Sequence, residues 1–173
     1  MSEKITAGSD MPEFDLPLVG GGKAHIGGQR EKYQLVVVYR GKHCPVCKKY
    51  LGGLNELRQT YANVNAEIIA LSGDPEDKAR ADVDEFGWAF DVGYGLSQDQ
   101  MRKLGLYISE PRSEKETDRP FPEPGVFVVN PQGKVQIVDI SNAPWARPDL
   151  ARLANGLKYL QDNEGYPIRG TLA

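Results

Sequence analysis

This chain has few of the residues that commonly bind metal ions or form structural cross-links. Only two cysteines and two histidines occur among its 173 residues, whereas a structural zinc site needs four ligands. The cysteines, Cys44 and Cys47, are three positions apart, and a disulfide that closes so short a loop hardly restricts the unfolded chain. We therefore expect no metal, no cofactor and no structural disulfide.

Long apolar runs and an excess of either charge are also missing. Lys and Arg total 21 against 24 for Asp and Glu, which leaves a net charge of -3 and no electrostatic reason to bind nucleic acid or an anionic membrane. No segment approaches the roughly 18 consecutive apolar residues of a membrane-spanning helix, and the first residues lack the apolar run of a signal peptide. We expect a cytoplasmic protein, in a compartment where a disulfide is more often catalytic than structural.

The residues that are present predict one α/β domain over 1–173 with an irregular tail at 163–173. Apolar residues make up 40% of the chain, enough for a sizeable core. The apolar runs at 35–39 and 67–71 predict buried strands, and residues 47–61 between them have apolar side chains at helical spacing. Strand, helix and strand in this order indicate a right-handed βαβ unit with parallel strands.

The rest of the pattern alternates turns with short helices and strands. We predict, in chain order, a turn-rich hairpin within 10–29, a helix with Asp74 as N-cap and Pro75 as first residue, a short helix over 97–104, a charged proline-rich loop over 107–124, a hairpin over 126–138 and a closing helix from about Pro148.

The two cysteines form a C-x-x-C motif where the first predicted helix begins. Unpaired backbone N–H groups and the helix dipole favour negative charge there, so a thiol ionises more easily, and the thiolate is the attacking species. His43, Lys42 and Lys48 add positive charge nearby in the sequence. We predict Cys44 and Cys47 as the catalytic pair, because the second sulfur can attack a mixed disulfide formed on the first.

Less active interpretations of the same residues stay open. Buried thiols also pack like small apolar side chains, so the pair could be inert, and half of a zinc site would need His25 and His43 as further ligands. His43 is equally compatible with a polar turn residue that has no catalytic role.

Several segments between residues 7 and 160 resemble the peroxiredoxin-like (AhpC/TSA) branch of the thioredoxin superfamily. These are the "P-x-F-x-L" opening at 7–16, a "V-S-x-D"-like turn at 71–74, the segments 90–94 and 104–106, and an "F-x-I-D-x-x-G"-like hairpin at 127–133. The resemblance implies a thioredoxin-like fold with a central mixed β-sheet, helices on both faces and an N-terminal hairpin extension. It also implies an antioxidant oxidoreductase.

The predicted site departs from that family's "P-x-x-x-T-x-x-C" motif. Cys47 takes the place of the cysteine that attacks peroxide, but Arg40 replaces the proline and Cys44 replaces the threonine. The threonine hydroxyl positions peroxide, and a thiol is a weaker hydrogen-bonding group. The family's arginine before the "F-x-I-D" strand is also missing, and Pro124 stands near its place.

Pro124 is similar to the cis-proline that thioredoxins keep before this strand, packed against the C-x-x-C. We therefore expect a cis bond before Pro124, with a strand-edge proline as the alternative. We predict Arg40, His43, Pro45, Lys48 and Pro124 as supporting residues of the site. The loop over 111–122 is expected to cover the site, because its end leads to Pro124.

Three functions fit the pair. A thiol–disulfide oxidoreductase would use Cys44 as nucleophile and Cys47 as resolving partner, and the missing peroxide-positioning groups favour it. A peroxidase would use Cys47 to attack a hydroperoxide and Cys44 to resolve the sulfenic acid, and the resemblance along nearly the whole chain favours it. A redox sensor would use the pair as a switch without catalysis. The expected partners are a disulfide or hydroperoxide substrate and a thiol reductant such as thioredoxin, glutaredoxin or glutathione, with a homodimer as a further candidate assembly.

Overall fold

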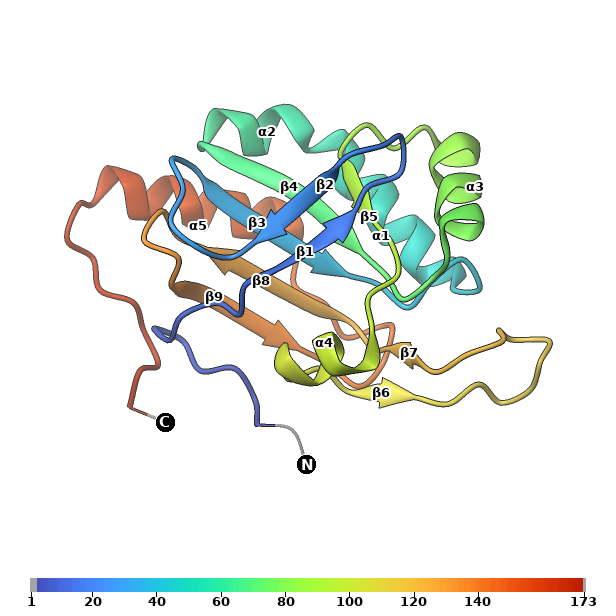
Figure 1. Ribbon diagram of the computed structural model, residues 1–173. Helices are drawn as coiled ribbons and strands as arrows, with labels where there is room; N and C mark the ends of the chain where they lie inside the picture. The colour runs from blue at the N-terminus through green and yellow to red at the C-terminus, as the bar shows by residue number, and fades with distance from the viewer. Residues whose placement is uncertain (1–2, 173) are drawn as a thin grey trace.

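The computed structural model describes residues 3–172, which are built around a five-stranded mixed sheet (Figure 1). Its strand order is β5-β4-β3-β8-β9, with bounds β5 (Asp91–Gly93), β4 (Ala66–Leu71), β3 (Tyr33–Val38), β8 (Gly125–Val129) and β9 (Val135–Ile140). The central strand β3 is parallel to β4 and antiparallel to β8. Residues 1, 2 and 173, which belong to the predicted domain and tail, lie outside the described residues.

Helices pack on both faces of this sheet. One face is covered by α1 (Pro45–Glu56), α2 (Arg58–Asn63), α3 (Glu76–Phe86) and α5 (Leu150–Asp162), which share a core cluster containing Leu51, Tyr61, Ala79 and Leu157. On the other face, α4 (Gln98–Lys103) lies beside a hairpin of β1 (Phe14–Pro17) and β2 (Lys23–Ile26). The predicted central sheet, flanking helices and N-terminal hairpin are confirmed.

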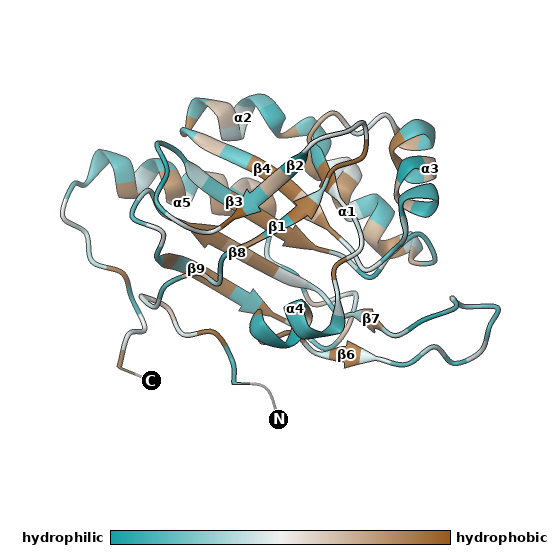
Figure 2. Ribbon diagram, in the orientation of Figure 1, coloured by the Kyte–Doolittle hydropathy of each residue, from teal (hydrophilic) through white to brown (hydrophobic). Residues whose placement is uncertain are grey.

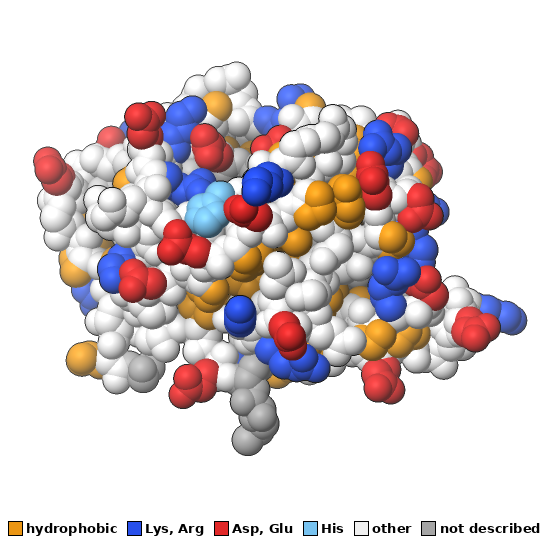
Figure 3. Space-filling view, viewed as in Figure 1, with side chains coloured by type: hydrophobic (Ala, Val, Ile, Leu, Met, Phe, Trp, Pro, Cys, Tyr) orange, Lys and Arg blue, Asp and Glu red, His pale blue; other side chains and the backbone are white. Residues whose placement is uncertain are grey.

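The apolar side chains of this fold are concentrated in the sheet. Figure 2 shows β3 and β8 as brown strands between helices that carry teal on their outer sides, and every residue of β8 is buried. On the face drawn in Figure 3, acidic and basic side chains are interspersed, without a large area of one sign. That mixture agrees with the small net charge of the chain.

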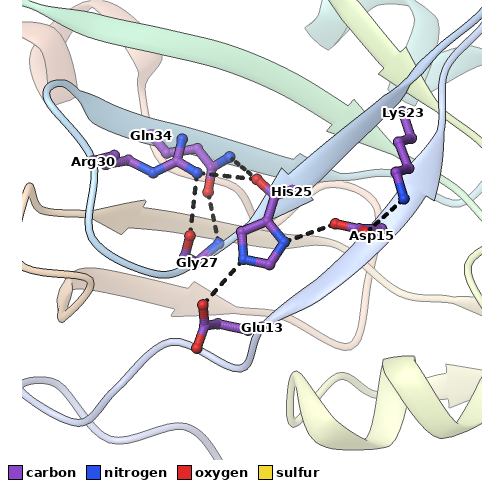
Figure 4. Close-up of polar contacts among 7 residues, drawn as sticks. All are labelled: Glu13, Asp15, Lys23, His25, Gly27, Arg30 and Gln34. Atoms are coloured by element: carbon purple, nitrogen blue, oxygen red, sulfur yellow. Dashed lines mark hydrogen bonds and ion pairs between the residues drawn. The ribbon is translucent and has the colours of Figure 1, made fainter.

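The N-terminal hairpin is fastened to the sheet by side chains of β3 and of the loop before it (Figure 4). Gln34 Nε2 donates to the carbonyl of His25 at 2.9 Å, and its Oε1 accepts from the N–H of Gly27 at 3.1 Å. Arg30 Nη2 donates to the carbonyl of His25 at 3.0 Å and to the carbonyl of Gly27 at 3.2 Å. On the outer side, His25 lies between the carboxylates of Asp15 and Glu13.

The helix predicted over 47–61 is divided into α1 and α2 at Leu57. This residue has non-helical dihedrals (φ -92, ψ 6), and its N–H bonds the carbonyl of Leu54 in a tighter turn. Periodicity alone did not reveal the break, because Leu54 and Tyr61 on either side of it are both fully buried.

Asp74 does not cap α3, so that part of the prediction is wrong. The helix begins at Glu76, and Pro75 is its N-cap without a side-chain hydrogen bond. The Asp74 carboxylate instead accepts the backbone N–H of Lys42 at 2.7 Å and lies against Gly41, where an added Cβ would come within 2.9 Å of it. Asp74 therefore fastens the loop that leads from β3 to the cysteines.

The predicted loop over 107–124 contains two short paired strands, β6 (Ile108–Ser109) and β7 (Phe121–Pro122). The residues between them, 110–120, form an arm that extends away from the sheet (Figure 1). Lys78 of α3 bonds Asp118 of this arm at 3.0 Å. The other predicted elements appear as α4, the β8–β9 hairpin and α5, which begins at Leu150 behind the N-cap Asp149. Residues 163–172 have no helix or strand.

Candidate functional site

The two cysteines lie between the end of β3 and the first turn of α1. Cys44 is the N-cap of α1, and Pro45 is the first helical residue, a position where proline lacks only an N–H that would be unpaired anyway. The Cys44 Sγ atom accepts the backbone N–H of Cys47 at 3.3 Å. The sulfur therefore replaces the oxygen of an ordinary N-cap side chain.

Both thiols are free and lie just below the surface. Cys44 is 1% and Cys47 0% exposed, whereas Pro45 and Val46 between them are exposed. A substrate at this surface would meet the helix end first and the sulfurs directly beneath it. The structure thus brings the predicted pair together, at the position that the C-x-x-C spacing indicated.

The surroundings of Cys44 favour its thiolate. A hydrogen bond from the Cys47 side chain, the backbone N–H of Cys47 and the Arg40 guanidinium together lower the pKa of Cys44 to about 6, against the opposing effect of burial. Arg40 Nη1 lies 3.9 Å from the sulfur. At neutral pH, most Cys44 side chains therefore carry a negative charge.

The surroundings of Cys47 favour its neutral thiol, and its sulfur contacts an arginine that the sequence did not indicate. Burial, together with its hydrogen bond to Cys44, raises the pKa of Cys47, so the single charge of the pair rests on Cys44. Arg147 acts against this rise, because its Nη2 lies 2.6 Å from the Cys47 Sγ atom. Arg147 comes from the segment between β9 and α5, and a separation of 100 residues gave no sequence signal for the contact.

Arg40 connects Cys44 to the base of the arm. Its Nε lies 3.0 Å from Oε2 of the buried Glu123, and its guanidinium carbon lies 4.8 Å from the ring centroid of Phe121. Glu123 Oε1 accepts a hydrogen bond from the Ser109 hydroxyl at 2.7 Å. Both strands at the base of the arm are thus linked through Glu123 to the residue that faces the thiolate.

His43 is close to this group but does not supply the expected positive charge. Burial, and then the charge of Arg40, lower the pKa of His43 to about 4, so the imidazole is neutral at pH 7. Its ring lies edge-on to Phe121, with centroids 4.5 Å apart. Neither ring nitrogen has a hydrogen-bond partner within residues 3–172. The expectation of a cationic His43 is wrong because the side chain is desolvated.

Lys48 and Pro124 also differ from expectation in detail. Lys48 is directed to Asp82 of α3, with Nζ 3.7 Å from Oδ1, rather than to either sulfur. The described residues include no cis peptide bond, so the expected cis bond before Pro124 is wrong. The trans bond lets the chain continue in an extended conformation from β7 into β8. In this segment, the Glu123 N–H donates to the carbonyl of Tyr107, and the Glu123 carboxylate pairs with Arg40.

Fold and cysteine pair together define a thioredoxin-like α/β protein of the peroxiredoxin-like class. Similar solved structures include a peroxiredoxin-like protein from Aquifex aeolicus, with a TM-score of 0.77 and 19% identity over 91% of this chain and 89% of that one. AhpC from Mycobacterium tuberculosis has a TM-score of 0.76 and 14% identity over 94% and 97% of the two chains. Peroxidoxin BcpB from the same organism has a TM-score of 0.72 and 16% identity over 90% and 98%.

The family itself follows from the sequence. The profile of the AhpC/TSA family matches residues 7–138, and the chain belongs to this family. No curated protein matches the chain. Membership of this family supports a thiol-based redox function. It does not distinguish a peroxidase from a disulfide-exchange enzyme.

Two further findings bear on the site and its surroundings. In the part of the chain that the structure describes, no group of three or more His, Cys, Asp or Glu side chains is arranged to hold a metal ion. Over the same range, no helix is both long and apolar enough to cross a membrane.

Proposed function

We propose that this protein is a thiol–disulfide oxidoreductase in which Cys44 is the nucleophile and Cys47 the resolving cysteine. The observation that carries the proposal is the position of the Cys44 sulfur as N-cap of α1, where it accepts a backbone N–H and its pKa is lowered to about 6. A thiol with a pKa near the ambient pH combines a large thiolate fraction with good nucleophilicity.

The reaction proceeds by two exchanges. The Cys44 thiolate attacks one sulfur of a substrate disulfide, the first substrate thiolate leaves, and a mixed disulfide remains on Cys44. Cys47 then loses its proton and attacks the Cys44 sulfur, which releases the second substrate thiolate and forms the Cys44–Cys47 disulfide. A cytoplasmic thiol reductant, such as thioredoxin, glutaredoxin or glutathione, returns the pair to the dithiol. A homodimer is compatible with this cycle and is not needed for it.

The supporting residues have separate parts in this proposal. Arg40 stabilises the Cys44 thiolate, and Pro45 fixes the first turn of α1 behind it. Pro124 directly precedes β8, and the next residue, Gly125, pairs with Val38 at the end of β3. Pro124 thereby holds Glu123 against Arg40. His43 provides a neutral imidazole next to the nucleophile. Lys48 pairs with Asp82 of α3 on the buried side of the helix.

A peroxidase is the second candidate, and Arg147 is the observation that favours it. Its Nη2 contacts the Cys47 sulfur, and its Nη1 is buried without a hydrogen-bond partner among the described residues. That free donor is suited to a hydroperoxide oxygen. Cys47 would attack this oxygen, releasing an alcohol or water, and Cys44 would resolve the sulfenic acid with loss of water. Arg147 would then replace the arginine that is missing before β8.

Separate serine variants of the two cysteines distinguish the candidates. Each is mixed first with an aromatic disulfide and then with hydrogen peroxide. Disulfide exchange predicts that Cys47→Ser still forms a mixed disulfide rapidly, whereas Cys44→Ser does not. Rapid sulfenic acid formation in Cys44→Ser, absent from Cys47→Ser, would assign the peroxidase instead. A non-catalytic sensor would turn over slowly in both assays, despite a well-defined reduction potential.

A further inference from the structure

A groove lies between α1 and the segment that joins β9 to α5, and we call it the α1–α5 groove. Its volume is about 650 Å³, within the ~300–1,000 Å³ typical of ligand sites. On one side it is lined by residues of the segment 144–151. On the other side it is lined by four residues of α1 at helical spacing, which therefore share one face of that helix. These four are Val46, Lys49, Tyr50 and Gly53.

One end of the α1–α5 groove reaches the cysteine pair. Val46 stands between the two cysteines in the sequence and is exposed. On the opposite wall, Arg147 contacts the Cys47 Sγ atom at 2.6 Å, and its guanidinium carbon lies 4.9 Å from the centroid of the Tyr50 ring. The Tyr50 hydroxyl donates to the carbonyl of Pro148 at 2.6 Å, so a hydrogen bond joins the two walls. A chain bound in this preformed groove would have its disulfide beside the start of α1.

Two residues of the groove have properties that the fold itself does not require. Trp145 is 79% exposed, although a large aromatic side chain is most useful where a partner covers it. Gly53 lies inside a helix, where glycine is less stable than alanine. Apart from the adjoining residues and backbone of α1, no described atom lies within 4 Å of a Cβ added at Gly53. Packing therefore does not explain this glycine, whereas a side chain at its position would occupy the groove.

The other side of the cysteine pair is unsuited to an extended substrate chain. β7, which leads to β8, is already paired with β6. The N–H of Glu123 between β7 and β8 donates to the carbonyl of Tyr107 at 2.8 Å, so this N–H cannot also bond a substrate backbone. Main-chain pairing next to β8 is thereby restricted, which favours the α1–α5 groove as the place where a substrate chain lies.

Length and charge indicate which chain fits the groove. Val46 and Glu56 both line it, and their separation along α1 corresponds to about 15 Å, a distance that about four or five extended residues span. Lys49 and Arg147 make the end near the cysteines basic. Glu56 and Asp149 make the end toward α2 acidic. An acidic group close to the substrate disulfide is therefore complementary to the groove.

We propose that the α1–α5 groove binds the chain next to the cysteine of a protein disulfide substrate. A carboxylate beside that cysteine faces Lys49, and a large apolar side chain further along packs against Trp145 and Gly53. The Cys44 thiolate bonds the substrate sulfur in the groove, and the second substrate sulfur leaves as a thiolate. Cys47 then loses its proton to solvent and displaces the bound sulfur, so the substrate is reduced as the pair is oxidised. This inference rests on the proposed disulfide exchange and adds the class of substrate to it.

Short peptides that carry a coloured aromatic thiol on their single cysteine test the inference. One peptide has aspartate beside the cysteine and phenylalanine within about four residues of it. Two comparison peptides replace the aspartate by lysine or the phenylalanine by serine. Attack by Cys44 on the peptide sulfur releases the coloured thiolate, and rapid mixing gives its rate constant. Dividing this constant by that for the aromatic disulfide alone gives the selectivity for the peptide chain.

The protein variants are chosen to change the groove and leave the cysteines in place. Gly53→Gln puts a side chain into the groove, and Gly52→Gln is its matched control, because Gly52 is the adjacent helical glycine and is not among the lining residues. We expect Gly53→Gln and Trp145→Ala each to lower the selectivity for the aspartate–phenylalanine peptide about tenfold, as the loss of an aromatic anchor does at interfaces. Gly52→Gln should keep the selectivity of the wild type.

Lys49→Gln tests the charge of the groove separately. In the wild type the aspartate peptide should react faster than the lysine peptide, and added salt should reduce this difference because Lys49 is exposed. In Lys49→Gln the difference should be smaller at low salt. A wild type that reacts equally fast with both peptides at low salt would contradict the proposed orientation of the substrate.

Selectivities of Gly53→Gln and Trp145→Ala that equal that of Gly52→Gln would overturn the inference and leave the proposed exchange intact. Failure of the wild type to react with the aromatic disulfide would overturn the exchange and the inference together. A wild-type dimer in sedimentation that becomes a monomer in Trp145→Ala, but not in Gly52→Gln, would assign the groove to a second copy of the chain instead. If Gly53→Gln does not fold, as judged by circular dichroism, Trp145→Ala decides alone, because Trp145 is exposed.

Discussion

At the scale of single residues, Arg147 is the side chain that separates the two candidate reactions. It contacts the sulfur of Cys47 rather than that of Cys44, so its loss should affect the two substrates differently. We expect Arg147→Gln to slow sulfenic acid formation from hydrogen peroxide by about a hundredfold if the protein is a peroxidase, the typical cost of losing a donor that stabilises developing charge. The rate of Cys44 attack on an aromatic disulfide should change little.

Stopped-flow measurement of both reactions checks this prediction, with Arg152→Gln as a control on the same side of the molecule. Arg152 lies in the first turn of α5 and is exposed. A large loss of disulfide exchange in Arg147→Gln, without a loss of peroxide reactivity, would contradict the proposed division of roles between Cys44 and Cys47.

The residues that sequence could predict are those whose chemistry is local. Cys44 and Cys47 are found from a three-residue spacing, because a helix start positions both sulfurs by itself. Arg147 could not be found in this way, since it reaches Cys47 only through tertiary packing. The charge of His43 was predicted wrongly because its burial depends on Phe121, which is distant in the chain.

At the scale of elements, α1 contains two adjacent glycines that its packing does not require. Apart from the adjoining residues and backbone of α1 itself, no described atom would lie within 4 Å of a Cβ added at Gly52 or Gly53. Glycine in a helix interior costs about 0.5–1 kcal/mol relative to alanine. We expect Gly53→Ala to increase the free energy of unfolding by about that amount, as measured by denaturant titration.

Gly105→Ala provides the opposite case for comparison. Gly105 has a φ of +68°, and an added Cβ would meet the backbone of residues 3–5 at 3.0 Å, so this variant should be less stable than the wild type. A loss of stability in Gly53→Ala similar to that in Gly105→Ala would show that α1 needs its glycines for a reason other than packing, such as local unwinding around the cysteines.

The N-terminal hairpin should respond to pH through His25. Its Nε2 lies 3.0 Å from Glu13 Oε1 and its Nδ1 lies 2.7 Å from Asp15 Oδ1 (Figure 4), and the hydrogen bonds with Glu13 and then Asp15 raise the pKa of His25 above its ordinary value of 6.5. A base with a raised folded-state pKa stabilises the fold fully below its unfolded pKa and loses this effect as pH rises through the folded value. The effect is small because the three side chains are largely exposed.

Unfolding midpoints of the wild type and His25→Gln, measured from pH 5 to about pH 9, test this response. We expect the difference between them to be largest at the acidic end and to vanish at the alkaline end. His43 contributes with the opposite sign, since its lowered pKa costs stability as the pH falls, but it is present in both proteins and cancels. A difference that grows with pH would contradict the arrangement around His25.

At the scale of the whole molecule, four of the five strands of the sheet were predictable because each has its own apolar run, whereas their order in the sheet was not predicted from the sequence. The apolar runs at 35–39 and 67–71 correspond to β3 and β4, and a tight-turn signal predicted the hairpin of β8 and β9. The arm between β6 and β7 was not predictable, because its two strands have only two residues each and its base is joined to Arg40 by tertiary contacts through Glu123 and Ser109. The structure that sequence could not reveal is thus the part that depends on the site.

That dependence predicts a coupling between the arm and the redox state of the cysteines. Arg40 faces two anions, the Cys44 thiolate and the Glu123 carboxylate, and formation of the Cys44–Cys47 disulfide removes the first. A neutral sulfur no longer orients the guanidinium, so the Arg40–Glu123–Ser109 contacts at the base of the arm should open more often. We expect the amides of residues 108–122 to exchange hydrogen faster in the oxidised protein, as measured by mass spectrometry.

An Arg40→Gln variant is the control that makes this coupling specific. It lacks the guanidinium in both redox states, so the exchange of 108–122 should be fast and independent of oxidation, while exchange in β3 and β4 should match the wild type. A wild-type arm whose exchange ignores the redox state would show that Arg40 holds the arm through Glu123 alone. The thiolate would then act only on substrate, and the arm would be a fixed wall of the site rather than a segment that responds to it.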